Sequence, residues 1–205
     1  MKILVDAHGR APNPRRVKIF LAEKGVDVDY EPVDLAEMEQ KKESLTRLNP
    51  LQRVPVLILD DGTVICESVA ICRYFEELHP EPALMGEGAQ GKAMVEMWQR
   101  RMELNFLFHV AQTFRHSHPA MKEMEVPQVP DWAAANPPHV LRMISMLDGE
   151  LAGREFIAGD RFTIADITAL IATDFMKVAR IDRPAGVPNF DRWYDAVSSR
   201  PSAGA

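Results

Sequence analysis

The segment from Asn49 to Ser68 constrains the fold of this chain more than any other part of its sequence. Pro55 is followed by the apolar run Val56–Leu59, by the turn Asp60-Asp61-Gly62 and by a second short β-prone run. Asp-Gly between two β-prone runs is a strong local signal for a hairpin. Proline is tolerated at the first residue of a strand. The sequence therefore predicts two antiparallel strands, with the next helix starting near Ser68.

The residues around this hairpin alternate between strand and helix patterns. We expect strands at 2–6 and 26–33, and helices at 15–24, 35–48 and 68–78. Prolines at positions 80 and 82 end the last of these helices, because proline lacks an N–H and restricts the residue before it. The predicted order is βαβ, then a helix, then two strands and a helix.

From residue 89 onward the pattern predicts helices alone. The clearest are at 89–116, as one long helix, and at 139–152 and 189–200, with a proline-rich interruption at 126–138. Thr163 and Asp166 have the spacing of a capping box, which predicts a further helix after Thr163. The last four residues, 202–205, are expected to be frayed. We expect one domain at 1–79, a linker at 80–88 and an all-helical domain at 89–205.

Composition excludes several classes of function. The net charge of −6 argues against nucleic acid or an anionic membrane as the main partner. No apolar run is long enough to span a bilayer, and residues 1–8 lack the apolar core of a signal peptide. Cys66 and Cys72 have neither Cys-x-x-Cys spacing nor the number needed for a disulfide framework or a metal site. We expect a cytoplasmic protein with two packed thiols.

Two motifs together resemble the cytosolic glutathione transferases, nearest to their bacterial nu-like classes. Gln52-Arg53-Val54-Pro55, with Glu67-Ser68 after it, is similar to the glutathione-binding half of that family, and the capping box at 163–166 is similar to a motif of its helical half. The resemblance covers essentially the whole chain. It implies an α/β, thioredoxin-like N-terminal domain followed by an all-α C-terminal domain. It also implies a homodimer, a role in detoxification and glutathione as co-substrate.

The resemblance implies a set of residues that bind glutathione. The Val54–Pro55 peptide bond would be cis, with the main chain of Val54 pairing with the cysteinyl part of the ligand. Glu67 would pair with the ligand ammonium, and Ser68 with the γ-glutamyl carboxylate at a helix N-terminus, where N–H groups are unpaired. Lys42 and Arg53 are candidates for the glycyl carboxylate. A simpler alternative is that Glu67 and Ser68 only cap the helix, and that Lys42 lies on a solvated face.

The sequence departs from the family at the residue that activates the thiol. Most members place Tyr, Ser or Cys just before the first helix, and aligning Arg16-Val17 with the family's Arg-Val puts Ala11 there. Asn13 matches the asparagine of the nu-class enzymes, and its amide could donate to the sulfur. Asn13 also fits an N-cap with Pro14 after it. His8, in the same loop, is the other candidate, because histidine titrates near neutral pH.

Two functions remain open at this point. The first is an enzyme, a glutathione transferase that promotes thiolate attack on a small electrophile or, as a glutathione-dependent reductase, on a disulfide. The second is a non-catalytic glutathione-fold binding or interaction protein, which Ala11 keeps possible. Polar residues of the long helix are candidates to line an electrophile pocket: Arg101, Asn105, His109, Arg115 and His116.

Overall fold

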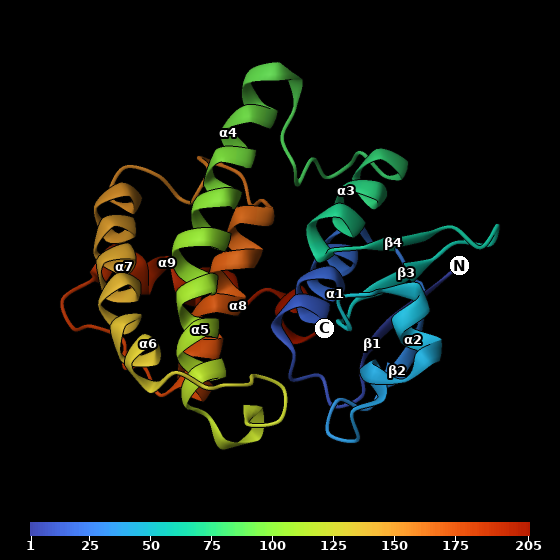
Figure 1. Cartoon of the computed structure of the whole chain (residues 1–205). Coiled ribbons are helices and arrows are strands. Elements are labelled where there is room, and N and C mark those ends of the chain that lie inside the picture. The colour runs from blue at the N-terminus through green and yellow to red at the C-terminus, as the bar shows by residue number, and fades with distance from the viewer. The chain divides into compact units, whose positions relative to one another are not determined.

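The computed structural model describes residues 1–205, which divide into two compact units (Figure 1). Unit 1 comprises Met1–Leu84 and Pro201–Ala205, and unit 2 comprises Met85–Arg200. The division lies inside the segment 80–88, which the sequence suggests as a linker. The last five residues belong to unit 1, whereas the sequence analysis places them in the helical domain.

Unit 1 is built on a four-stranded mixed sheet. Its strands are β1 (Lys2–Asp6), β2 (Asp29–Val33), β3 (Val56–Ile58) and β4 (Val64–Cys66), in the order β2-β1-β3-β4. β1 is parallel to β2 and antiparallel to β3, and β3 is antiparallel to β4. The hairpin predicted around Asp60-Asp61-Gly62 is therefore confirmed.

Three helices accompany this sheet: α1 (Pro12–Lys24), α2 (Glu43–Leu48) and α3 (Ser68–Leu78). α1 and α3 pack against each other through apolar residues such as Val17, Phe20 and Phe75, which are fully or almost fully buried. The element order and the helical second unit confirm the predicted fold class.

The single helix predicted at 35–48 is wrong. The structure has a 3-10 turn, η1 (Glu39–Lys41), before the short α2. The carboxylate of Asp34 accepts the N–H groups of Ala36 and Glu37, and Met38 has a left-handed backbone with φ 55°. The two bonds to Asp34 cap the first turn of a helix, but a left-handed residue cannot continue an α-helix, so the turn ends at Met38.

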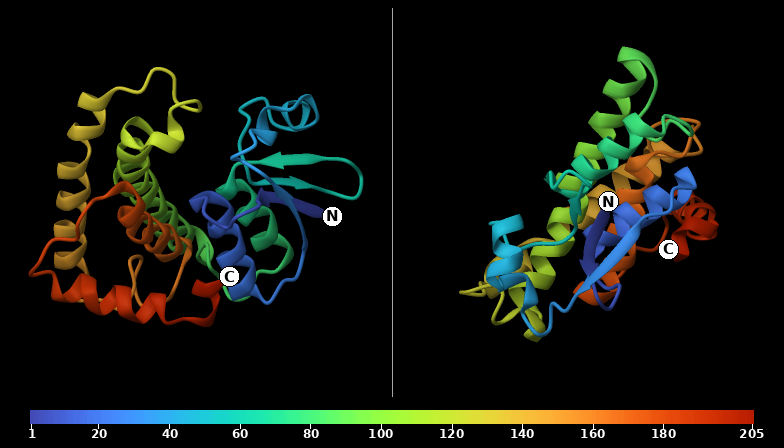
Figure 2. Two further views of the ribbon diagram at one scale, coloured as in Figure 1. Left: turned by 90° about the horizontal axis from the view of Figure 1, so that it is seen from below. Right: turned by 90° about the vertical axis from the view of Figure 1, so that its right-hand side faces the viewer.

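Unit 2 is helical throughout. It contains α4 (Gly88–Met102), α5 (Phe108–Ser117), α6 (Pro130–Ala135), α7 (Pro137–Leu151), α8 (Ile164–Ala179) and α9 (Pro188–Ser198), with a short 3-10 turn, η3 (Pro119–Met121), after α5. The long helix predicted at 89–116 is present, but the π-helical segment η2 (Glu103–Leu107) joins its halves α4 and α5. Figure 2 shows the two halves running on in one direction. None of the helices combines the length and apolar character that crossing a membrane requires.

α8 forms the centre of unit 2, and 12 of its 16 residues are buried. The capping box predicted at its start is confirmed. The Asp166 carboxylate accepts the N–H of Thr163 at 2.9 Å, and it also accepts the Ile157 N–H and the indole N–H of Trp193. This one buried carboxylate therefore ties the start of α8 to the preceding loop and to α9.

The C-terminal residues are ordered against unit 1 and are not frayed. They form the 3-10 turn η4 (Pro201–Gly204), which packs on α1, and Figure 2 shows the turn beside that helix. The guanidinium of Arg15 donates to the carbonyl of Ala203 at 3.0 Å, and the hydroxyl of Ser202 donates to the Glu23 carboxylate. Serine and alanine carry no local pattern that predicts such contacts.

Candidate functional site

The sheet topology brings the predicted site residues to one end of unit 1. Val56 of β3 lies opposite Leu4 of β1 and opposite Cys66 of β4, and both pairings are antiparallel. The C-terminal ends of β1 and β4 therefore lie beside the N-terminal end of β3. β2 runs parallel to β1 and ends at the same side. The segments that carry Asn13, Lys42, Val54 and Ser68 all start from this end of the sheet.

Val54 presents main-chain groups that the protein does not use. The Val54–Pro55 peptide bond is cis. Asn49 shapes the preceding loop, because its amide donates to the carbonyl of Arg53 at 2.9 Å and its side-chain oxygen accepts the N–H of Leu51. Neither the N–H nor the C=O of Val54 forms a backbone hydrogen bond. An extended peptide can pair with such open main chain.

The N-terminus of α3 is also open. Glu67 is the N-cap residue and is exposed, and no side chain caps the helix. Its φ of 70° lies in the left-handed region, where a residue other than glycine is strained by about 1–3 kcal/mol. The first N–H groups of an uncapped helix favour the binding of a carboxylate at that end. The alternative in which Glu67 and Ser68 serve as side-chain caps is therefore not observed.

Ser68 is bonded by Arg16, a residue of α1 that the sequence does not predict to take part in the site. Ser68 is 5% exposed, and its Oγ accepts a hydrogen bond of 2.6 Å from Nη1 of Arg16 in α1. Arg16 itself is only 1% exposed. The available signal was its spacing, since Arg16 shares the inner face of α1 with Phe20, four residues later.

Asn13 lies at the second residue of α1 and is exposed. The prediction that it is the N-cap is wrong, because α1 begins at Pro12 and Ala11 holds that position without a side-chain bond. Asp6, at the end of β1, instead accepts the N–H groups of Arg10 at 2.6 Å and Ala11 at 3.1 Å. These bonds fix the loop that leads into α1 and leave the Asn13 amide free of a capping role.

The remaining candidates of unit 1 are exposed. Lys42 forms an ion pair of 2.8 Å with Glu39, and this hydrogen bond is the main reason that the pKa of Glu39 lies below its usual value. Arg53 directly precedes Val54 and is exposed. His8 is exposed and lies 3.7 Å from the Asp34 carboxylate.

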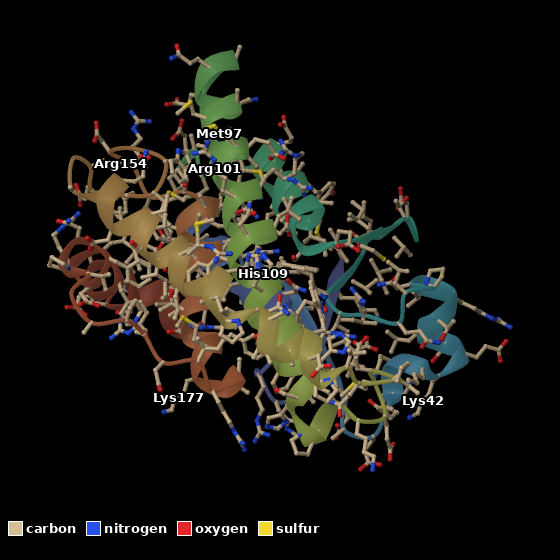
Figure 3. The ribbon with its side chains drawn as sticks, turned by 60° about the vertical axis from the view of Figure 1, so that its left-hand side comes forward. Lys42, Met97, Arg101, His109, Arg154 and Lys177 are labelled. Carbon is tan, nitrogen blue, oxygen red and sulfur yellow. The ribbon has the colours of Figure 1, made fainter.

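Most polar residues predicted along the long helix have partners within unit 2. The guanidinium of Arg101 lies 4.6 Å from the centre of the Trp98 ring, and His109 bonds Asn136 at 2.6 Å. Figure 3 shows Arg101 and His109 at separate positions along that helix. Arg115 bonds Glu125 at 2.5 Å, His116 lies 3.8 Å from the same carboxylate, and Asn105 is exposed.

Both cysteines are free thiols. Cys72 is fully buried in α3, and burial raises its pKa to about 12. Burial also raises the pKa of Cys66, which is half-buried at the end of β4.

Comparison with known proteins decides the family. Residues 11–78 match the family described as the glutathione S-transferase N-terminal domain, and residues 98–201 match its C-terminal domain. The chain belongs to the glutathione S-transferase family. It is 33% identical over 204 residues to glutathione S-transferase 2 of Saccharomyces cerevisiae, which covers 98% of this chain and 88% of that protein.

Solved structures of glutathione S-transferases have the same fold. The crystal structure of a glutathione S-transferase domain-containing protein from Marinobacter aquaeolei superposes with a TM-score of 0.94 at 36% identity and covers 98% of this chain and 99% of that chain. The structure of Gtt2 from Saccharomyces cerevisiae gives a TM-score of 0.94 at 33% identity, with 100% and 99% coverage. The family assignment therefore extends over both units.

Proposed function

We propose that this member of the glutathione S-transferase family is an active glutathione transferase that holds its co-substrate, glutathione, at the open end of the unit 1 sheet. Similarity over the whole length to a yeast protein named glutathione S-transferase 2 favours the enzyme over a binding protein without turnover. The family assignment supplies the reaction class, in which the glutathione thiolate attacks an electrophile.

The observation that carries the placement of glutathione is the uncapped N-terminus of α3 beside the unpaired main chain of Val54. The cysteinyl part of the ligand pairs with Val54, next to Pro55. The γ-glutamyl carboxylate receives the α3 N–H groups and the Ser68 hydroxyl, and Glu67 receives the ammonium. Lys42 and Arg53 lie on segments from the same end of the sheet and meet the glycyl carboxylate.

Asn13 takes the role that a hydroxyl or thiol has in most members of the family. Ala11 has no donor, whereas the Asn13 amide is exposed at the start of α1. A hydrogen bond to a charged group contributes about 1.5–3 kcal/mol, and a helix N-terminus adds about 0.3–1 kcal/mol. Lowering a thiol pKa by two units requires about 2.7 kcal/mol. The two effects together amount to about 1.8–4 kcal/mol, a range that includes this requirement.

The finer assignments follow from family membership and are part of the same proposal. The second substrate is a small electrophile, turnover serves detoxification, and the protein is a cytoplasmic homodimer. Sedimentation equilibrium of the purified protein tests the dimer directly.

The decisive experiment is a pH titration of bound glutathione followed by the ultraviolet absorbance of its thiolate. We expect the thiol to titrate at least one unit below free glutathione. A titration that coincides with free glutathione would show a binding protein without thiol activation. The absence of glutathione binding in calorimetry would overturn the site itself.

A further inference from the structure

We infer that Arg16 is a positioning residue for glutathione and that it acts through Ser68. This inference rests on the proposed function, because it concerns the carboxylate that the N-terminus of α3 receives. It adds a buried cation of α1, which does not touch the ligand, to the residues that set glutathione affinity.

The first argument is the burial of the arginine. Arginine is rarely fully buried unless the guanidinium serves a specific contact. Arg16 is 1% exposed, and its hydrogen bond to Ser68 Oγ is itself buried and joins residues 52 positions apart in the chain. Its positive charge also acts on Cys72, one turn further along α3, where it opposes the burial that raises the Cys72 pKa. The guanidinium therefore lies against the first turn of α3.

The second argument is the direction of the hydrogen bond. A guanidinium has only donors, so Ser68 Oγ must be the acceptor of this bond. The hydroxyl proton of Ser68 then cannot point toward Arg16. It is left to donate to another group, and the uncapped N–H groups of the same helix turn already favour a carboxylate. Arg16 thus selects the hydroxyl orientation that a ligand carboxylate needs.

The third argument is charge. A hydroxyl that accepts from a cation becomes a stronger donor, because hydrogen bonds in a chain polarise one another. The same cation lies behind a helix N-terminus, which carries a partial positive charge of its own. Both effects favour the γ-glutamyl carboxylate, the part of glutathione that the Ser68 hydroxyl and the α3 N–H groups receive.

Two probes separate this role from a structural one. The first probe is glutathione, and the second is γ-aminobutyryl-cysteinylglycine, which keeps the ammonium but lacks the γ-glutamyl carboxylate. In calorimetry we expect Arg16→Met to weaken glutathione binding about tenfold and to leave binding of the second probe within about twofold. Ser68→Ala is expected to show the same pattern, and the double variant should bind glutathione no more weakly than Ser68→Ala alone.

Lys24→Met is the matched control. Lys24 is also a buried cation of α1 and also binds α3, but at the far end, through Glu76 and the carbonyl of His79. Its loss should leave the affinity ratio of the two probes at the wild-type value. If Arg16→Met does not fold, Arg16→Lys answers the same question. Arg16→Lys alone should lose some affinity for glutathione, less than Arg16→Met is expected to lose. The same substitution added to Ser68→Ala should cause no further loss.

An equal loss of affinity for both probes in Arg16→Met, or a further loss when Arg16→Met is added to Ser68→Ala, would overturn the inference. The proposed function would survive that result, since wild-type protein would still prefer glutathione to the second probe. Wild-type protein that binds the two probes equally would instead overturn the carboxylate site and the role of Arg16 with it.

Discussion

In the proposed function, Ala11 and Asn13, two residues apart at the start of α1, determine how the thiolate of glutathione is stabilised. Ala11 holds the N-cap position without a side-chain bond, and Asn13, two residues further on, is exposed. Because the capping role falls to neither side chain, the amide is available for a ligand sulfur.

Asn13→Ala should therefore impair turnover more than binding. We expect kcat/KM to fall about 10- to 100-fold, since a hydrogen bond to a charged group contributes about 1.5–3 kcal/mol. The pKa of the bound thiol should rise by about one to two units, while the affinity for glutathione changes little. Steady-state kinetics measures kcat/KM, and the ultraviolet absorbance of the thiolate, titrated against pH and against glutathione, measures the pKa and the affinity.

Asn189 offers a matched control for this change. It follows Pro188 at the start of α9 in unit 2, just as Asn13 follows Pro12 at the start of α1. Asn189→Ala should leave the thiol pKa unchanged. A parallel decline in binding and turnover in Asn13→Ala would assign Asn13 to general ligand contact and not to thiol activation.

The two cysteines should differ in reactivity. A thiol with a pKa of about 12 is ionised at pH 8 to only about one part in ten thousand, and Cys72 is also fully buried. In native protein we expect iodoacetamide to modify Cys66 first, with the rate rising with pH, and Cys72 only after unfolding. Mass spectrometry of timed samples tests this, and native labelling of Cys72 ahead of Cys66 would contradict it.

The sequence could suggest candidate site residues where the signal is local, and it could not where the partner is distant. Val54, Pro55, Glu67 and Ser68 belong to one short hairpin-helix segment with its own motif. Arg16 could not be found in the same way, because its partner is 52 residues away and depends on how α1 packs on α3.

At the scale of elements, the capping box of α8 depends on the carboxylate of Asp166, which accepts several hydrogen bonds. Asp166 is fully buried and accepts bonds from Ile157, Thr163 and Trp193. Burial raises its pKa, and these hydrogen bonds oppose that change.

Asp166→Ala should destabilise unit 2 by about 3 kcal/mol or more, because each buried donor left without a partner costs about 1–3 kcal/mol. Urea unfolding followed by the fluorescence of the three tryptophans of unit 2 measures the loss. Asp131, exposed in the first turn of α6, is the control, and Asp131→Ala should change stability by no more than about 0.5 kcal/mol. A comparable effect of the two substitutions would refute the role assigned to the capping box.

α5 and α7 meet through two stacked histidines. The rings of His109 and His139 are 4.4 Å apart and nearly parallel, at 8°. The Asn136 amide NH2 donates to the carbonyl of Trp132, so its oxygen faces His109 and accepts a hydrogen bond from Nδ1–H. The guanidinium of Arg142 donates to Nδ1 of His139. The bond to Asn136 therefore places a hydrogen on Nδ1 of His109, and the bond from Arg142 requires Nδ1 of His139 to be an acceptor, which only the neutral ring provides.

Protonation of His139 should weaken this contact. Desolvation lowers the pKa of His139, and the neighbouring His109 and Arg142 lower it further. A histidine whose folded pKa is depressed contributes stability above its unfolded pKa of about 6.5 and loses it as the pH falls through the folded value. The urea concentration at the unfolding midpoint of unit 2 should therefore decrease as the pH is lowered below about 6.5. The decrease should be smaller in His139→Phe, which keeps an aromatic ring at the stack. His8→Phe, in unit 1, is the control. An NMR pKa for His139 at or above 6.5 would count against this account.

Helices and strands could be predicted from the sequence where the spacing of apolar residues and the residues that end an element indicate the same limits. β1 and α3 have the predicted limits because a short apolar run and an amphipathic run each end at a clear boundary. The failures, at 35–48 and in the middle of the long helix, have other causes. Met38 has a left-handed backbone that ends the helical turn before α2, and a π-helical segment adds no distinctive residue type to the sequence.

At the scale of the whole molecule, the chain finishes on the unit in which it begins. Residues 201–205 belong to unit 1, although the 116 residues from Met85 to Arg200 form unit 2. The three tryptophans, Trp98, Trp132 and Trp193, all lie in unit 2, so tryptophan fluorescence reports on that unit, whereas the proposed glutathione site lies in unit 1.

Deleting residues 201–205 should therefore loosen α1 selectively. The deletion removes the bond from Arg15 to the Ala203 carbonyl and the bond between Ser202 and Glu23, each of which contributes about 1–3 kcal/mol because one partner is charged. Hydrogen exchange measured by mass spectrometry should show faster exchange in α1 and unchanged protection in α8. Glutathione affinity should decline as well, because α1 carries both Asn13 and Arg16. Ser199→Ala, which alters an exposed hydroxyl bonded within α9, should change neither readout. Unchanged protection of α1 in the truncated protein would mean that η4 rests on the helix without stabilising it.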